Sequence, residues 1–204
     1  MSNAIFINYY KLKQGASVPD FLASVEKLVN EYASKQKGFI SFNLLVDNDL
    51  WADIGVFESM EDAKNFANPS STNNLAQKFY SFLDLKNCVS HLFSVERNYQ
   101  YKDIMPKVVT LVTYKLKSGT AKSDFLLAAD KAGNQPVAKD SVTISWQPLV
   151  DGDTWADLVY WESMDGPRKA SSSENENPAI KEYLSFIDEV LFHRHFEVKK
   201  FLSV

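Results

Sequence analysis

Two aspartates and two histidines are the residues of this sequence whose types and spacing could do chemistry. Asp53 lies in the stretch WADIGVFESM, which returns as WADLVYWESM around Asp157. A carboxyl group among apolar side chains has a raised pKa, and it can act as a general base or hold a ligand hydroxyl group. His91 and His195 follow the two aspartates at equal distances, and imidazole titrates near neutral pH. The sequence therefore offers Asp157 with His195, and Asp53 with His91, as candidate catalytic residues.

Each candidate also has a structural interpretation, which stays open at this point. An aspartate near a strand end can simply hydrogen-bond a loop amide, since most charged side chains lie at or near the surface. A lone buried histidine is more often a hydrogen-bonded core residue than a catalyst. His193, His195 and Glu197 share one strand face and could ligate zinc or iron, but no third ligand from another element is evident, so we assign no metal site.

The candidates belong to a repeat of domain length. The two tryptophans that open the quoted stretches are 104 residues apart (155 minus 51), and the same offset aligns residues 4–100 with the second half of the chain. A solenoid unit would be much shorter, so the sequence indicates a duplicated module. The segment RNYQYKDIMPK is polar and ends beside a proline, as linkers do. We expect a first repeat at 1–100, a linker at 101–107 and a second repeat at 108–204.

Within each repeat, the hydrophobic period alternates between that of strands and that of helices. Residues 4–12 and 108–116 are β-branched and aromatic and predict strands, and Ser17 is suited to begin a helix. Phe39–Val46 predicts the next strand, and the acidic turn after it leads into the strand with the aspartate. A helical region follows, which the run SSSENENP breaks in the second repeat, and then a last strand around the histidine. Gly133 to Pro136 interrupts the first helix of the second repeat.

The order βαββαβ predicts an α+β fold of two tandem ferredoxin-like repeats, each with helices on one face of an antiparallel sheet. The other face needs a partner, so we expect the two sheets to pack against each other as an intramolecular eight-stranded barrel, a pseudo-dimer within one chain. The expected strand order 4-1-3-2 places one strand between aspartate and histidine, about 10 Å apart at the backbone. A ligand or water could contact both, but a direct pair is not expected.

Three features occur in both repeats: WAD followed by an aromatic-Glu-Ser, at Phe57-Glu58-Ser59 and Trp161-Glu162-Ser163; a broken second helix; and a late strand with His91 or His195. In these features the chain resembles the dimeric α+β barrel superfamily, and within it the antibiotic biosynthesis monooxygenase-like proteins. The resemblance implies a pocket between each sheet and its own helices. It also implies a cofactor-independent monooxygenase or related enzyme acting on an apolar or aromatic small molecule. The candidate ligand-binding residues are Asn8, Tyr10, Phe57, Tyr114, Trp155 and Trp161, and the aromatic ones among them can also be core residues.

Haem degradation, ligand binding without catalysis and a purely structural role are the competing interpretations. The haem-degrading branch of the superfamily needs an asparagine, a tryptophan and a histidine that neither repeat has complete: the first has Asn8 but Ala67 at the histidine position, and the second has Val112 and Ser171. A non-catalytic ligand-binding protein and a purely structural barrel remain alternatives. The histidine variant His195→Ala separates them, because only an enzyme loses turnover while keeping its fold.

Composition limits the partners. The formal net charge of -4 without a basic cluster argues against nucleic acid, and no apolar run reaches the ~20 residues that cross a bilayer. The single cysteine, Cys88, and an N-terminus unlike a signal peptide favour the cytoplasm. The expected partner is a small-molecule ligand, no cofactor is predicted, and oligomerisation beyond the pseudo-dimer stays open.

Overall fold

The computed structural model of the protein describes residues 3–70, 73–134, 142–173 and 177–203. The chain divides into two compact units. The first contains residues 1–94 and the segment that begins at Lys199, and the second contains Val95–Val198. This division by contacts falls a few residues before the linker that the sequence repeat suggested at 101–107.

The first unit has the predicted order of elements. Its strands and helices are β1 (Ala4–Lys11), α1 (Val18–Glu31), β2 (Phe39–Asp47), β3 (Leu50–Phe57), α2 (Met60–Ser70), α3 (Asn74–Tyr80) and β4 (Val89–Val95), with short 3-10 turns at Ala33–Lys35 and Leu85–Asn87. Ser17 begins α1 as predicted, and its hydroxyl accepts a hydrogen bond from the Asp20 amide over 3.4 Å. Between β2 and β3, Asn48 has a positive φ of 54°, as a tight turn requires.

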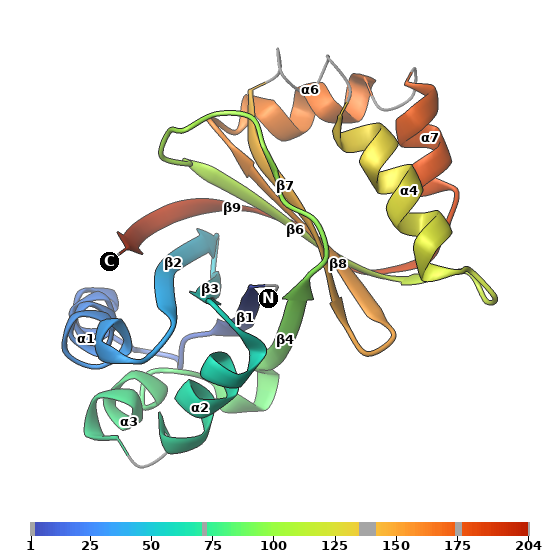
Figure 1. The fold of residues 1–204 in the computed structure, drawn as a ribbon. Helices are drawn as coiled ribbons and strands as arrows, with labels where there is room; N and C mark the ends of the chain where they lie inside the picture. The colour runs from blue at the N-terminus through green and yellow to red at the C-terminus, as the bar shows by residue number, and fades with distance from the viewer. Residues whose placement is uncertain (1–2, 71–72, 135–141, 174–176, 204) are drawn as a thin grey trace. The chain divides into compact units, whose positions relative to one another are not determined.

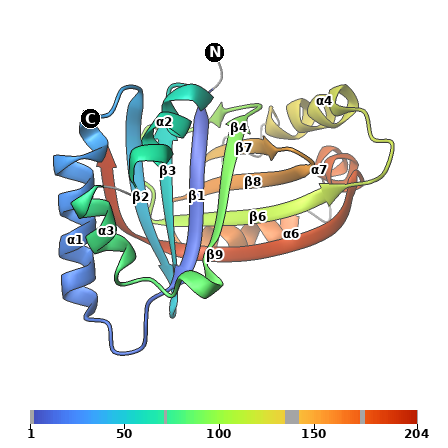
Figure 2. The same cartoon turned by 90° about the horizontal axis from the view of Figure 1, so that it is seen from below.

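The sheet of the first unit is antiparallel, with the order β4-β1-β3-β2 that the ferredoxin-like fold predicts (Figure 2). Helices α1, α2 and α3 cover one face of it (Figure 1). Because side chains alternate along a strand, every second residue faces these helices. On β1, Tyr10 packs with Phe21 of α1 and Phe79 of α3, and Asn8 shares its face. An aromatic core therefore fills the space between this sheet and its own helices.

The second unit repeats this layout. Its elements are β5 (Tyr99–Gln100), β6 (Val108–Leu116), α4 (Lys122–Gly133), β7 (Thr143–Asp151), β8 (Thr154–Trp161), α6 (Asp165–Ser173), α7 (Pro178–Leu184) and β9 (Ile187–Ser203). The antiparallel order is β9-β6-β8-β7-β5, and α4, α6 and α7 lie on one face (Figure 1). The described part of α4 ends at Gly133, and Gln135 and Pro136 of the predicted interruption lie outside the described residues.

The residues just before the expected linker are structured. Tyr99 and Gln100 pair with β7 opposite Trp146 and Ser145. The Tyr99 hydroxyl donates to Asp130 over 2.7 Å, and Arg97 donates to the same carboxylate through two nitrogens, at 2.8 and 3.2 Å. Gly133 lies so close to this tyrosine that a Cβ there would be 2.7 Å from the ring. This arrangement attaches the start of the second unit to α4.

β9 belongs to both units by its contacts. Its residues up to Val198 lie in the second unit, and those from Lys199 lie in the first. There Leu202 packs against the aromatic core of the first sheet, and Lys200 forms an ion pair with Glu26 of α1. The first unit is thus completed by residues from the far end of the sequence.

The α+β class and the βαββαβ order of both repeats are confirmed. The second helical region is broken in both, into α2 and α3 and into α6 and α7. Within the described residues, no helix has both the length and the apolar character needed to span a membrane.

Candidate functional site

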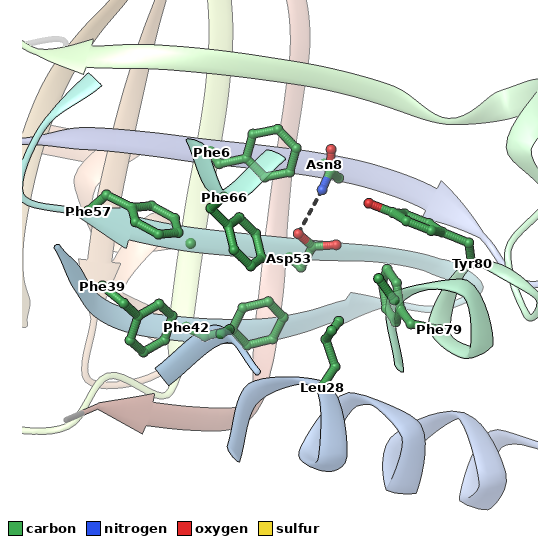
Figure 3. Close-up of a pocket in the computed structure, with 13 residues that line it drawn as sticks. Phe6, Asn8, Leu28, Phe39, Phe42, Asp53, Phe57, Phe66, Phe79 and Tyr80 are labelled. Carbon is green, nitrogen blue, oxygen red and sulfur yellow. Dashed lines mark hydrogen bonds between the residues drawn. The ribbon is translucent and has the colours of Figure 1, made fainter. Parts of the chain in front are cut away.

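The first unit contains a cavity between its sheet and its helices (Figure 3). Its open volume is about 30 Å³. It is lined by Phe6, Asn8, Leu28, Ala33, Phe39, Phe42, Asp53, Gly55, Phe57, Phe66, Ala76, Phe79 and Tyr80. Most of these side chains are aromatic, and none of them is lysine, arginine or histidine. The cavity is thus an apolar space with one acidic group, Asp53, in its wall.

Asp53 reaches the cavity from the middle of β3. It pairs with Asn8 of β1, and the neighbouring strand positions place both side chains on the helix-facing side of the sheet. The Asn8 amide donates to Asp53 Oδ1 over 2.8 Å, and the Ser90 hydroxyl donates to the Asn8 carbonyl oxygen over 2.6 Å. Figure 3 shows the Asn8–Asp53 bond beside the aromatic rings. A chain of hydrogen bonds across three strands therefore fixes the carboxyl group.

The second carboxyl oxygen of Asp53 has no such support. The side chain is only 4% exposed, yet Oδ2 makes no hydrogen bond to any described residue, and the same holds for the buried Tyr10 hydroxyl. An unpaired buried polar group costs about 1–3 kcal/mol, and more when charged. Few such groups persist in folded proteins without a functional reason or a bound molecule. These two oxygens mark the place where a ligand could complete the hydrogen bonding.

Burial raises the pKa of Asp53 to about 7, and the neighbouring Asn8 and Tyr10 only partly oppose this by lowering it. The Tyr10 hydroxyl lies near enough to influence the carboxyl group, although the two make no hydrogen bond of normal length and angle. The pKa of Tyr10 is itself raised, first by burial and then by the negative charge of Asp53. A pKa near 7 is the value that suits a general base at neutral pH.

The equivalent carboxyl group of the second unit, that of Asp157, has more hydrogen-bond donors around it. Asp157 Oδ1 accepts hydrogen bonds from the Tyr183 hydroxyl at 2.8 Å, the Trp146 indole nitrogen at 2.9 Å and the Tyr114 hydroxyl at 3.3 Å. The two tyrosine hydroxyls are also 2.6 Å apart. Three donors from its own chain thus surround this oxygen, and the aromatic rings of Phe125, Tyr183 and Trp146 pack around them.

The two histidines lie on different faces of their sheets. His91 pairs with Ile7, so it faces away from the helices and from the cavity, and its ring stacks on Phe93. His195 pairs with Thr110, and its Nδ1 lies 2.8 Å from the Thr110 hydroxyl, which also accepts a hydrogen bond from Trp161. As expected from the strand order, β6 lies between His195 and Asp157, and β1 lies between His91 and Asp53.

The other predicted pocket residues divide between the two units. Asn8 and Phe57 line the cavity, and Tyr10 lies in the adjoining core. Tyr114 and Trp155 are core residues of the second unit, and Trp161 is buried there with its indole bonded to Thr110. The sequence-based choice omitted the rings of Phe6, Phe42, Phe66 and Phe79 and the hydroxyl of Ser90. The alternation of Phe6 with Asn8 and Tyr10 along one strand was a usable signal for the first of these.

Metal ligands do not gather in the described residues: no group of three or more His, Cys, Asp or Glu side chains is placed to hold an ion. His193 and His195 have their ring centres 4.8 Å apart. Burial, and then the charge of Arg194, lowers the pKa of His193.

No protein-family model and no curated protein sequence matches this chain. Solved structures do. A candidate monooxygenase from Fusobacterium nucleatum is 11% identical, with a TM-score of 0.69, covering 99% of this chain and 94% of its own. An anthrone oxidase-like protein is 12% identical, with a TM-score of 0.65, covering 100% and 94%. A haem-binding protein from Thermus thermophilus is 9% identical, with a TM-score of 0.61, covering 98% and 92%.

These similarities confirm the fold. The chain has the dimeric α+β barrel fold that the sequence resemblance implied. At such low identity the likeness concerns the fold alone, and the neighbours themselves differ in what their names say they do.

Proposed function

We propose that the cavity of the first unit binds a small aromatic molecule, and that Asp53 removes a proton from it as the first step of a cofactor-independent oxygenation. One observation carries the proposal: a buried carboxyl oxygen without a partner, in a group with a pKa of about 7, faces an aromatic cavity. Clefts with aromatic walls and a few polar groups are the usual form of small-molecule sites.

The raised pKa suits Asp53 to this task. A phenolic hydroxyl has a pKa of about 10, and an ordinary aspartate, near 4, is far too weak a base for it. At about 7, the carboxyl group of Asp53 lies roughly three units closer, while enough of it is ionised at neutral pH to accept a proton. The hydrogen bond from Asn8 holds the other oxygen, so that Oδ2 is the atom that receives the proton.

Removal of this proton makes the substrate electron-rich, and the anion can then reduce dioxygen without help from a metal or flavin. Anthrone loses its proton from the CH2 group between the rings, and the anion that results is phenolate-like, so the same comparison of basicity applies to it. Its oxidation balances as follows. The CH2 group between the rings becomes a carbonyl group, one oxygen atom enters the product, and the second leaves as water with the two hydrogens. Dioxygen is the only oxidant that this reaction needs. The names of two structural neighbours, a candidate monooxygenase and an anthrone oxidase-like protein, support this reaction class.

The cavity is too small for an aromatic ligand unless its wall rearranges. An open volume of about 30 Å³ accommodates only about two water molecules. A ligand with rings therefore requires side chains in the wall to move, and Phe66 of α2 is only half-buried. Side-chain rearrangement of this kind is common on binding.

The test is oxygen uptake with anthrone as the substrate. We expect the wild-type protein to accelerate uptake and form the carbonyl product, and Asp53→Asn to lose at least ~100-fold in rate, since general-base catalysis contributes 10²–10⁴-fold. The matched control is Asp157→Asn, which makes the same change in the second unit and should keep the activity. Equal activity of Asp53→Asn and the wild type would refute the role of Asp53.

The competing function is ligand binding without chemistry. It is favoured by the lining of the cavity, where Asp53 stands without a histidine or lysine among the described residues. Calorimetric titration separates the two functions: a binding protein takes up the aromatic compound but shows no oxygen consumption above the uncatalysed rate.

The setting of this activity follows from the sequence. We infer that the protein acts on a small molecule and not on nucleic acid, because its net charge of -4 disfavours phosphate contacts. We also infer that it acts in the cytoplasm, since its single cysteine, Cys88, favours a reducing compartment.

A further inference from the structure

The equivalent carboxyl groups of the two units differ in their hydrogen bonds. Both aspartates are buried, at 4% exposure for Asp53 and 9% for Asp157. In the second unit, three donors of the protein itself converge on one carboxyl oxygen. In the first unit, one oxygen accepts from Asn8 and the other has no partner among the described residues.

The difference traces to a few substitutions between the repeats. With the offset of 104, Tyr183 corresponds to Phe79 and Trp146 to Phe42, so the first unit lacks both donors while keeping the rings. Both phenylalanines line the cavity. The third donor is common to the repeats, since Tyr114 corresponds to Tyr10, whose hydroxyl is left without a partner.

The second unit also shows which kind of group can join such a tyrosine to such a carboxyl group. The Tyr183 hydroxyl donates to Asp157 and is 2.6 Å from the Tyr114 hydroxyl, so a single oxygen joins the tyrosine of β6 to the carboxylate of β8. In the first unit, a ligand oxygen within hydrogen-bond distance of both groups would satisfy Tyr10 and Asp53, once the Phe79 ring, the counterpart of the Tyr183 ring, moves aside for it. It must accept a hydrogen bond from the tyrosine and donate one to the carboxylate. A hydroxyl group does both through one oxygen atom, which an ammonium or an ether oxygen cannot.

We propose that the first unit binds an aromatic compound whose phenolic hydroxyl bridges Tyr10 and Asp53. In the second unit, the side chains of Tyr183 and Trp146 take the place of such a ligand. This inference rests on the proposed function and names its substrate class. It also assigns binding to the first unit, because in the second the place of the ligand hydroxyl is filled.

A second difference supports the same assignment. Gly55 lies in the cavity wall beside Asp53, and the second repeat has Val159 there. A Cβ at Gly55 would lie 3.3 Å from the ring of Phe57, so even a methyl group would crowd a ring that lines the cavity. The glycine keeps this part of the wall open.

The experiment is calorimetric titration of the wild-type protein with two probes, 1-naphthol and naphthalene, which share their rings and differ in the hydroxyl group. We expect naphthol to bind at least tenfold more tightly, because naphthalene leaves the two buried oxygens unpaired. Equal affinity for the two probes, or no binding of naphthol, would overturn the assignment of a phenolic ligand.

A variant provides the second arm. Phe79→Tyr introduces the hydroxyl group that the second unit already has, and it should weaken naphthol binding at least tenfold while the thermal midpoint at pH 8 is kept or raised. Phe42→Trp adds the other donor and replaces the first variant should that fail to fold. Unchanged naphthol affinity in a folded variant contradicts the proposal.

The two proposals fail separately. Anthrone turnover that depends on Asp53, without preference for naphthol over naphthalene, leaves the proposed function standing and removes the phenolic ligand. Selective naphthol binding without oxygen uptake keeps the ligand class and indicates a binding protein.

Discussion

The replacement of Asp53 by asparagine should stabilise the protein at alkaline pH, although it changes a buried, hydrogen-bonded side chain. In the unfolded chain the carboxyl group has a pKa near 3.8, and in the folded protein burial raises the pKa to about 7. The folded state therefore holds a proton that the unfolded state has already released, and wild-type stability falls as the pH rises from about 4 to about 7. A shift of about three units corresponds to about 4 kcal/mol.

Asparagine has nearly the same shape and carries no charge, so it does not suffer this loss. Its carbonyl oxygen can still accept the hydrogen bond from Asn8. We expect the gain of Asp53→Asn over the wild type to be about 4 kcal/mol at pH 8 and under about 2 kcal/mol at pH 5. Urea unfolding followed by circular dichroism at both pH values measures the two differences, and effects of other titrating groups cancel in the comparison.

Asp157→Asn is the matched control, and its effect should have the opposite sign. Three donors converge on Asp157 Oδ1, and an asparagine there would bring an NH2 group that needs a hydrogen-bond partner of its own in this buried place. We expect a loss of about 1–3 kcal/mol at pH 8. Our reasoning about Asp53 is wrong if Asp53→Asn is less stable than the wild type at pH 8, or if its gain does not change with pH.

Three further variants test the cavity and the second unit. Gly55→Val gives the first repeat the residue of the second and should weaken naphthol binding at least tenfold by calorimetry, at about 1–3 kcal/mol of stability from overpacking; unchanged affinity would show that the ligand lies elsewhere. Asn8→Ala removes the donor that lowers the pKa of Asp53, so the pH profile of oxygen uptake should move to higher pH, and a shift to lower pH contradicts the assignment. Gly133→Ala places a Cβ 2.7 Å from the Tyr99 ring and should lower the stability by about 1–3 kcal/mol in urea unfolding, whereas an unchanged midpoint means that the ring moves aside freely.

The sequence predicted the strands and the face of each aspartate well, because both depend on local patterns. Alternation along β3 placed Asp53, Gly55 and Phe57 on one face, and the structure has all three in the cavity wall. The turn residues after β2 and the serine that begins α1 also act where the sequence suggested. These features need only the neighbours of a residue along the chain.

The face of the sheet on which each histidine lies could not be predicted from local patterns in the same way. A constant offset makes His195 the equivalent of His91, so the pair of Ile7 with His91 predicts a pair of Leu111 with His195. In the structure, Leu111 pairs with Arg194 instead, one residue out of step. The register of β9 against β6 shifts twice, and a slip of one residue turns a side chain to the other face of the sheet. Irregularities of pairing depend on two strands at once, so the sequence of one does not reveal them.

The hydrogen-bond partners of each carboxyl group likewise could not be predicted from the sequence. The letters show that Phe42 and Phe79 correspond to Trp146 and Tyr183, but not that the indole and the phenol converge on one oxygen. The sequence-based pairing of His195 with Asp157 stays a prediction. The structure favours the first unit as the binding unit, because the carboxyl group of Asp53 has fewer hydrogen bonds than that of Asp157.

The path of β9 also bears on how the protein is made. Since residues from Lys199 onward belong to the first unit, the ribosome must translate the entire second repeat before the first can complete its sheet and core. Domains usually fold as units while the chain emerges, the N-terminal one first. Here the repeat that is made first must wait for its last strand segment, so premature termination within the second repeat would also leave the first repeat without the residues from Lys199 onward.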